Sequence, residues 1–177
     1  MRFRLLVAAC LLLCVGTWPH LRSLLYPMGY EDVLLACSEE FDVPPSLLCA
    51  VIRQESRFRQ DAVSHAGAYG LMQLTEPTFR ELSAELGMSD EDIMSPYHNV
   101  RCGTYYLRCL YDRYGSWKTA LAAYNAGMGN VDRWLTDERY SSDGINLYTV
   151  PYSETAAYVR NIMEIKENYY KIYNLGS

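Results

Sequence analysis

Apolar positions recur every three to four residues along most of this chain, which is the period of an amphipathic helix. No stretch alternates apolar and polar residues for long enough to indicate a strand. The apolar stripes and their boundaries predict helices over residues 30–41, 46–56, 76–86, 99–114, 116–125, 129–135 and 153–173. The predicted fold class is therefore all-α, with about seven helices in one domain and no internal repeat.

Several helix ends are predicted from residues with known capping preferences. Pro45 suits the first position of the second helix. Asn99 is predicted to cap the start of the long fourth helix, and Gly115 suits the left-handed position that follows its end. Ser116 and Ser153 are predicted to cap the helices that begin beside them.

The N-terminus has the pattern of a targeting segment. Arg2 and Arg4 precede an apolar run from Leu5 to Trp18, which is shorter than the roughly 20 residues of a membrane span. No clean cleavage site follows it, so a cleaved signal peptide and an uncleaved anchor both stay open. Residues 1–29 are predicted to be this leader with a short spacer, and residues 30–177 to be the domain. Basic residues before the apolar run predict an extracytoplasmic domain, anchored on the outer face or secreted.

Composition narrows the class of protein further. The 177 residues suit a single globular domain. The formal net charge is −5, and without residues 1–29 the balance is 13 basic to 21 acidic residues. Lys and Arg are not clustered, so nucleic acid is not expected as a partner.

Four cysteines lie beyond the leader, all in helical patterns. Outside the cell they permit two disulfides, but free cysteines in such positions also pack as small apolar residues. We expect a structural role for these residues, Cys37, Cys49, Cys102 and Cys109. No metal-type spacing such as C-x-x-C or H-E-x-x-H occurs, so neither a metal nor a cofactor is expected.

Glu55 is the residue around which the rest of the chain is organised. It continues the apolar stripe of Leu48 and Ile52, and it lies near the negative end of the helix dipole. Burial and the dipole both raise a carboxyl pKa, which is what a general acid near neutral pH requires. The alternative is a structural ion pair between this carboxylate and one of three nearby arginines, Arg53, Arg57 or Arg59.

Three further segments carry candidate chemistry. Gly70-Leu-Met72-Gln73 places a thioether and an amide after a glycine, in a predicted short helix; the alternative is a helix start with Met in the core. Tyr124 and Asn125 lie in the last turn of an Ala-rich helix before a glycine, which is also an ordinary helix end.

The third segment is Pro151-Tyr-Ser-Glu154-Thr, with Tyr158 soon after it. It has the pattern of a capped helix start. Glu154 would stabilise the helix dipole there, and that alternative is strong.

Taken in order, Glu55-Ser56, Gly70-Leu-Met-Gln73 and Ala123-Tyr-Asn-Ala-Gly127 resemble the lytic transglycosylase family of the soluble (SLT) type, related in fold to goose-type lysozyme. The segment from Pro151 to Tyr158 is similar to the C-terminal segment of that family. Each motif is weak alone, but four in this order are specific. The resemblance covers about residues 30–173.

The resemblance implies a small lysozyme-like helical domain around a glycan groove. It implies cleavage of peptidoglycan between N-acetylmuramic acid and N-acetylglucosamine, with formation of 1,6-anhydromuramoyl ends. Glu55 is carried over as the sole catalytic acid and base. The residues carried over to the groove or its support are Ser56, Met72, Gln73, Tyr124, Asn125, Glu154 and Tyr158. The expected partners are glycan strands and, through the leader, the membrane, and the protein is expected to be a monomer.

The residues themselves fit this chemistry. Glycosidic cleavage needs a proton on the leaving oxygen as positive charge develops on the sugar, and a hydrolase usually needs a second carboxylate. The loop after Glu55 offers only Asp61, and nothing in the sequence places it across a cleft. Two alternatives stay open: a hydrolytic muramidase on the same fold, and a non-catalytic peptidoglycan-binding module of the envelope.

Overall fold

The structure, a computed structural model, describes residues 24–89 and 91–175. Its main helices are α2 to α8, and one small hairpin accompanies them. The helices are α2 (Glu31–Phe41), α3 (Pro45–Ser56), α4 (Glu76–Glu85), α5 (Pro96–Tyr114), α6 (Trp117–Ala126), α7 (Met128–Leu135) and α8 (Ser153–Tyr173). The prediction of an all-α fold is confirmed, and most helix bounds agree within three residues.

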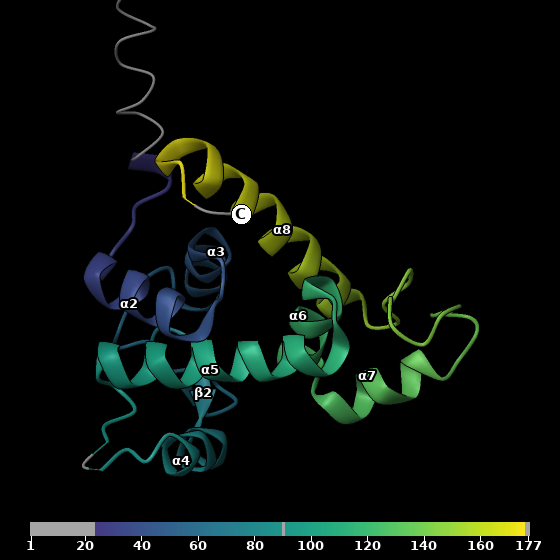
Figure 1. The fold of residues 1–177 in the computed structure, drawn as a ribbon, viewed down its shortest axis with the longest axis horizontal. Helices are drawn as coiled ribbons and strands as arrows, with labels where there is room; N and C mark the ends of the chain where they lie inside the picture. The colour runs from purple at the N-terminus through teal and green to yellow at the C-terminus, as the bar shows by residue number, and fades with distance from the viewer. Residues whose placement is uncertain (1–23, 90, 176–177) are drawn as a thin grey trace, which may run out of the picture.

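The long helix α5 crosses the middle of the molecule (Figure 1). It packs against α2, α4 and α6, while α3 packs along α8. Figure 1 also shows α7 and the loop after it extending to one side, away from α2 and α3. The end of α3 and the first turns of α8 are thereby held next to each other, although about 100 residues separate them in the chain.

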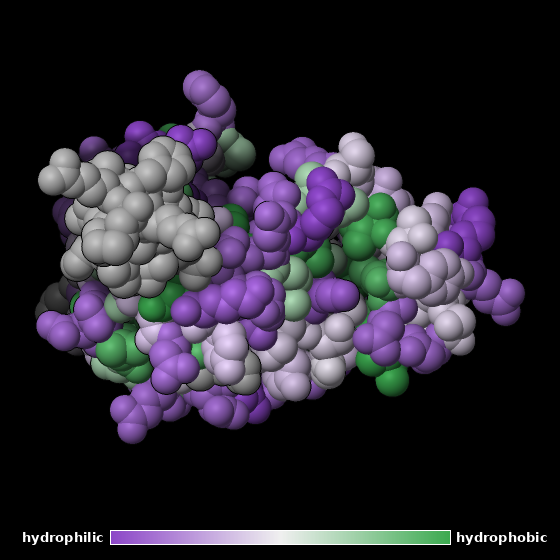
Figure 2. All heavy atoms as spheres, turned by 90° about the horizontal axis from the view of Figure 1, so that it is seen from above, coloured by the Kyte–Doolittle hydropathy of each residue, from purple (hydrophilic) through white to green (hydrophobic). Residues whose placement is uncertain are grey.

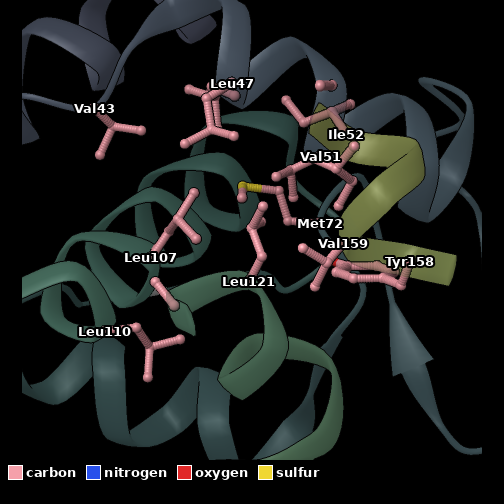
Figure 3. Packing of buried hydrophobic residues seen from close by; sticks show 14 of the residues in the cluster. Val43, Leu47, Val51, Ile52, Met72, Leu107, Leu110, Leu121, Tyr158 and Val159 are labelled. Atoms are coloured by element: carbon pink, nitrogen blue, oxygen red, sulfur yellow. The ribbon is translucent and has the colours of Figure 1, made fainter. Parts of the chain in front are cut away.

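The core explains why α3 is held so firmly. Every residue from Ser46 to Ile52 is buried. Figure 3 shows Val51 and Ile52 of this helix, Leu121 of α6 and Tyr158 of α8 gathered around one apolar centre. A helix buried on nearly all sides keeps one orientation, so the residues in its last turn are fixed as well.

Two helix starts differ from the prediction. Helix α5 begins at Pro96, three residues before Asn99, because a proline fits the first turn of a helix. Asn99 is not a cap: it is buried inside the helix, and its side chain bonds to other parts of the chain. Ser153 is the first residue of α8, and Tyr152 holds the N-cap position in its place. Ser116 stands at the N-cap of α6 as predicted, but its side chain makes no capping bond.

The predicted short helix at Gln73 is also wrong. A hairpin replaces it, in which β1 (Ala68–Tyr69) pairs antiparallel with β2 (Leu74–Thr75). Gly70 and Gln73 have φ angles of 76° and 50°, which a right-handed helix does not allow. The glycine takes this conformation at little cost, and Gln73 takes it with help from its side chain, described below.

The segment just before α2 packs on the far end of α8. The hydroxyl groups of Tyr169 and Tyr173 donate to the backbone carbonyls of Pro27 and Tyr26, each at 2.7 Å. Asn168 donates to the Tyr26 hydroxyl at 2.8 Å. Residues 26–29, which the sequence placed in the spacer, therefore contact the domain directly. Residues 1–23 of the predicted leader lie outside the described residues.

Two further expectations concern the cysteines and the membrane. Cys37, Cys49, Cys102 and Cys109 are all free thiols in the structure, and the first three are buried. Of the two options that the sequence left open, the structure has the unbridged one. Among the helices that the structure describes, none has the length and apolar character needed to cross a membrane.

Candidate active site

Glu55 lies in the last turn of α3, where the helix ends at Ser56 and Arg57 turns into a left-handed conformation with φ 53°. Its side chain is partly exposed, whereas its neighbour Ser56 is buried and donates its hydroxyl to the carbonyl of Ile52 at 3.1 Å. The Glu55 carboxyl is thus held by a rigid element but is not sealed off from solvent.

The Tyr158 hydroxyl donates to Oε1 of Glu55 at 2.6 Å. This bond joins α3 to α8, and it occupies one of the two carboxyl oxygens. When the carboxyl is protonated, its proton therefore belongs on Oε2, the oxygen that does not accept from Tyr158.

Burial raises the pKa of Glu55 from 4.5 to about 7, and the hydrogen bond from Tyr158 opposes that rise. The ion-pair alternative is not supported, since none of the ion pairs formed by the described residues includes Glu55. The Arg53 guanidinium lies over the ring of Tyr26 at 4.7 Å, and Arg59 donates to the carbonyl of Ser56.

Tyr124 brings α6 to the same place. Its hydroxyl donates to the backbone carbonyl of Met72 at 2.8 Å, and its ring lies 5.4 Å from that of Tyr106. Burial, followed by the nearby charge of Glu55, raises the pKa of Tyr124 well above its ordinary value. The same two causes act on Tyr158, so both hydroxyls stay protonated beside the carboxyl.

The Gly70–Gln73 loop reaches the site through its backbone. The Met72 side chain is fully buried and packs against α5 at Gly103, so it supports the site and does not face a ligand. The Gln73 amide donates to the carbonyls of Ala62 and Gly70, at 3.1 and 2.9 Å. These bonds hold Gln73 in its left-handed conformation, and they place its side chain within the loop.

Asn125 and Glu154 lie at the facing ends of α6 and α8. Thr155 donates its hydroxyl to Oδ1 of Asn125 at 2.7 Å, which ties the two helix ends together. Glu154 is exposed in the first turn of α8, one helical turn before Tyr158. It also fits the alternative of stabilising the helix dipole.

Sequence reasoning missed Asn99 as part of this region. Its side chain accepts from the backbone N–H of Met72 at 2.7 Å and donates to the carbonyls of Tyr69 and Ile93, each at 2.9 Å. One signal existed: Asn99, Gly103 and Tyr106 follow the i, i+4, i+7 spacing of a buried helix face.

The arrangement of the helices around Glu55 identifies the class of fold. The solved structure of an inactive glutamate-to-glutamine mutant of lytic transglycosylase Slt from Pseudomonas aeruginosa matches with a TM-score of 0.78 and 33% identity. The match covers 88% of this chain and 26% of that one. The 70 kDa soluble lytic transglycosylase of Escherichia coli in complex with bulgecin A matches with a TM-score of 0.76 and 28% identity, over 86% of this chain and 26% of that one. The fold is the lysozyme-like one of these structures.

The family follows from the sequence matches. The model of the transglycosylase SLT domain matches residues 33–146, and the chain belongs to this family. The soluble lytic murein transglycosylase of E. coli K12 is 32% identical over 162 residues, which are 88% of this chain and 25% of the relative.

Membrane-bound lytic murein transglycosylase C of Actinobacillus pleuropneumoniae is 28% identical, over 81% of this chain and 46% of that protein. The chain thus spans about a quarter of the length of its soluble relatives and under half of this membrane-bound one.

Proposed function

We propose that this protein is a peptidoglycan lytic transglycosylase that cleaves the β-1,4 bond between N-acetylmuramic acid and N-acetylglucosamine, with Glu55 as its only catalytic acid and base. The observation that carries the proposal is a partly exposed carboxyl whose pKa burial raises to about 7, which accepts a hydrogen bond from Tyr158 and whose charge acts on Tyr124. The sequence relatives are named as lytic murein transglycosylases, and one similar solved structure is that of an inactive lytic transglycosylase mutant with glutamine in place of a glutamate.

In the first step, Glu55 gives the proton on Oε2 to the glycosidic oxygen as the bond to the anomeric carbon breaks. The sugar then carries a developing positive charge. In the second step, the ionised carboxylate takes a proton from the sugar's own 6-hydroxyl, and that oxygen bonds to the anomeric carbon. Glu55 ends protonated, no water is consumed, and the product is a 1,6-anhydro ring.

The surroundings of Glu55 favour this route over hydrolysis. A hydrolase places a second carboxylate across the cleft to direct water or to attack the sugar. No carboxylate is among the groups that shift the pKa of Glu55, and Asp61 is exposed in the loop after α3. A single carboxyl that acts first as the acid and then as the base needs no second carboxylate, which agrees with the groups found around Glu55.

The glycan strand would lie in a recess beside the start of α8. Figure 2 shows the surface hollowed between the main body and the lobe on the right, with apolar side chains inside it and hydrophilic ones at its rim. We propose that Asn125 and Glu154 contact hydroxyl and acetamido groups of the strand. Tyr158 orients the acid through its hydrogen bond, while Tyr124, Ser56, Met72 and Gln73 support the site.

The leader and the relatives support an extracytoplasmic location. Some relatives are named as soluble and others as membrane-bound. We propose that the segment before Tyr26 directs export of the domain. If this segment is not cleaved, it anchors the domain at the outer face of the membrane. We also propose that the protein is a monomer. The domain itself would then begin its contacts at Tyr26.

The decisive experiment replaces Glu55 with Gln in the full chain and incubates it with peptidoglycan. We expect clearing of peptidoglycan to fall at least 100-fold, because an amide cannot supply a proton. Mass spectrometry of the wild-type digest should find muramoyl ends lighter by one water than hydrolysis products. Asp61→Asn, which also converts a carboxylate to an amide, should keep activity.

Other outcomes would reject parts of the proposal. Reducing muramoyl ends in the wild-type digest would identify a hydrolase, and activity lost in Asp61→Asn would support it. Unchanged clearing by Glu55→Gln would exclude Glu55 as the acid. Binding of peptidoglycan without any cleavage would identify a non-catalytic envelope module.

The unfolding free energy of the Glu55→Gln variant, measured at two pH values, shows whether the variant is folded. A carboxyl with a raised folded-state pKa loses stability as pH rises from 4.5 to about 7, because in that window the unfolded chain releases the proton that the folded protein still holds. The glutamine variant should therefore unfold like wild type at pH 4 and be more stable by about 2 kcal/mol at pH 8. Urea unfolding at both pH values measures this difference. Equal stability of the two proteins at pH 8 would contradict a buried carboxyl.

A further inference from the structure

We propose that Asn99 is a positioning residue for the acid chemistry of Glu55, acting through the backbone of Met72 and the hydroxyl of Tyr124. The inference rests on the proposed function of Glu55. Asn99 itself lies on α5 and makes its bonds to the backbone behind the site.

The first link joins Asn99 to the loop. Its side chain is fully buried, and its amide bonds to three backbone groups, one in the loop at Met72 and one just before it at Tyr69 of β1. Buried amides with complete hydrogen bonding fix the groups around them, since breaking one bond leaves a polar atom without water.

The fit between Asn99 and the loop is tight. A Cβ atom on Gly70 would lie 2.4 Å from Nδ2 of Asn99, closer than any real contact. The glycine therefore lets the loop backbone sit directly on the amide. Met72 is fixed from its other side as well, since a Cβ on Gly103 would lie 2.5 Å from its sulfur. Met72 is thus held by two parts of α5, at its backbone N–H by Asn99 and at its side chain by Gly103.

The second link joins the loop to the acid. The carbonyl of Met72, whose N–H and side chain are held by α5, accepts the one hydroxyl proton of Tyr124. With that proton committed, the Tyr124 oxygen can only accept hydrogen bonds from the side of Glu55. The titratable groups that face Glu55 are Tyr158 from α8 and Tyr124 from α6, with Tyr106 of α5 behind the latter.

The consequence concerns where the Tyr124 proton points. If the Met72 carbonyl moves, the Tyr124 hydroxyl is free to turn toward the carboxylate whose field acts on it. A new donor stabilises the ionised form of Glu55 and lowers its pKa. Fewer molecules then carry the catalytic proton at neutral pH. Asn99 keeps the proton on Glu55 by keeping the Tyr124 proton elsewhere.

The test is a double-mutant cycle read as pH profiles of peptidoglycan cleavage, using the full chain. Asn99→Ser should move the alkaline limb of the kcat profile down by about one pH unit, while KM changes less than twofold. In a Tyr124→Phe background, which has no hydroxyl to turn, Asn99→Ser should cause no further shift of the limb. A purely structural role would lower activity in both backgrounds and leave the limb in place.

Two more variants keep the test decisive if Asn99→Ser does not fold. Gly103→Ala pushes Met72 from its other side and leaves the bonds of Asn99 intact, so it should shift the limb in the same direction, again only when Tyr124 is present. Ser83→Ala removes a fully buried hydroxyl on α4, which donates to the carbonyl of Phe79, and it should leave the limb unmoved. An unmoved limb in Gly103→Ala, or equal shifts in both Tyr124 backgrounds, would overturn the proposal.

The cycle separates this inference from the proposed function. If Glu55→Gln remains fully active, the assignment of Glu55 fails, and the inference fails with it. If Glu55→Gln is inactive and Asn99→Ser leaves the limb unmoved, only the role of Asn99 is rejected.

Discussion

At the scale of single residues, the site consists of one carboxyl and two phenols, of which only Tyr158 bonds to the carboxyl. The Tyr158 hydroxyl bonds to Glu55 and stabilises the ionised form, while the Tyr124 hydroxyl bonds away from it to Met72. Burial outweighs the single donor, because it is the larger of the two causes that act on the pKa of Glu55. A proton is therefore retained near neutral pH, yet the carboxylate formed during catalysis still has one partner.

Removing the Tyr158 hydroxyl should raise the pKa of Glu55 further. In Tyr158→Phe the ionised carboxyl loses its donor, so we expect the alkaline limb of the activity profile to move up by about one pH unit. Cleavage at pH 6 should fall about tenfold, because the carboxyl loses its fixed orientation. Both are measured from initial rates of peptidoglycan cleavage between pH 4 and pH 9.

Tyr170→Phe is the matched control, since this tyrosine lies on the same helix but is exposed. Its profile should coincide with that of wild type. A limb that moves down in Tyr158→Phe would mean that the hydroxyl does not stabilise the charged form of Glu55.

At the scale of elements, the Gly70–Gln73 loop is the part of the site that secondary-structure patterns describe worst. It follows β1 and leads into β2, and its conformation depends on a glycine pressed against Asn99 of α5. Its backbone provides the acceptor for Tyr124. Helix α5 thus shapes the site without placing a side chain next to Glu55.

Gly70 and Gly67 allow a controlled test of this packing, because both have φ angles near 75°. A Cβ on Gly67 meets nothing within 4 Å, so Gly67→Ala should cost only about 1 kcal/mol of unfolding free energy from backbone strain. Gly70→Ala adds a collision with a buried side chain and should cost about 3 kcal/mol. Urea unfolding curves measure both, and equal losses would show that the contact with Asn99 is not tight.

At the scale of the whole molecule, the segment just before α2 contacts both α3 and α8, through Tyr26 and Pro27. Tyr26 lies edge-on to Tyr169 at 5.6 Å and under the guanidinium of Arg53. Because Arg53 is two residues from Glu55 and Tyr169 is on the helix of Tyr158, this segment holds together the two helices that make the site. Tyr26 is therefore where the chain passes from its predicted leader into the domain.

Removing the Tyr26 side chain should therefore destabilise the whole domain. Tyr26→Ala loses the ring contacts with Tyr169 and Arg53 and the bond from Asn168, so we expect it to lower the unfolding free energy by about 2 kcal/mol. Leu24→Ala, two residues earlier and 77% exposed, should change it by less than about 0.5 kcal/mol. Thermal or urea unfolding of the full chain distinguishes them, and a loss as small as that of Leu24→Ala would mean that the segment does not brace the domain.

The sequence by itself determined the helices and the main candidate acid. A period of 3.6 residues is a local property, and Glu55 could be found because a carboxylate there continues an apolar stripe at the end of its own helix. Motif order was enough to indicate the family. These features depend on residues close together in the chain, where spacing alone limits the geometry.

Only the tertiary structure decided what surrounds the acid. Tyr158 meets Glu55 across 103 positions, and Asn99 meets Met72 across 27, and no local pattern contains such pairs. Asn99 was mistaken for a cap and Gln73 for part of a helix because capping and helix preferences describe a chain without neighbours. In the folded molecule, hydrogen bonds to distant backbone groups outweighed those preferences, since a buried polar group must find its partners wherever the fold places them.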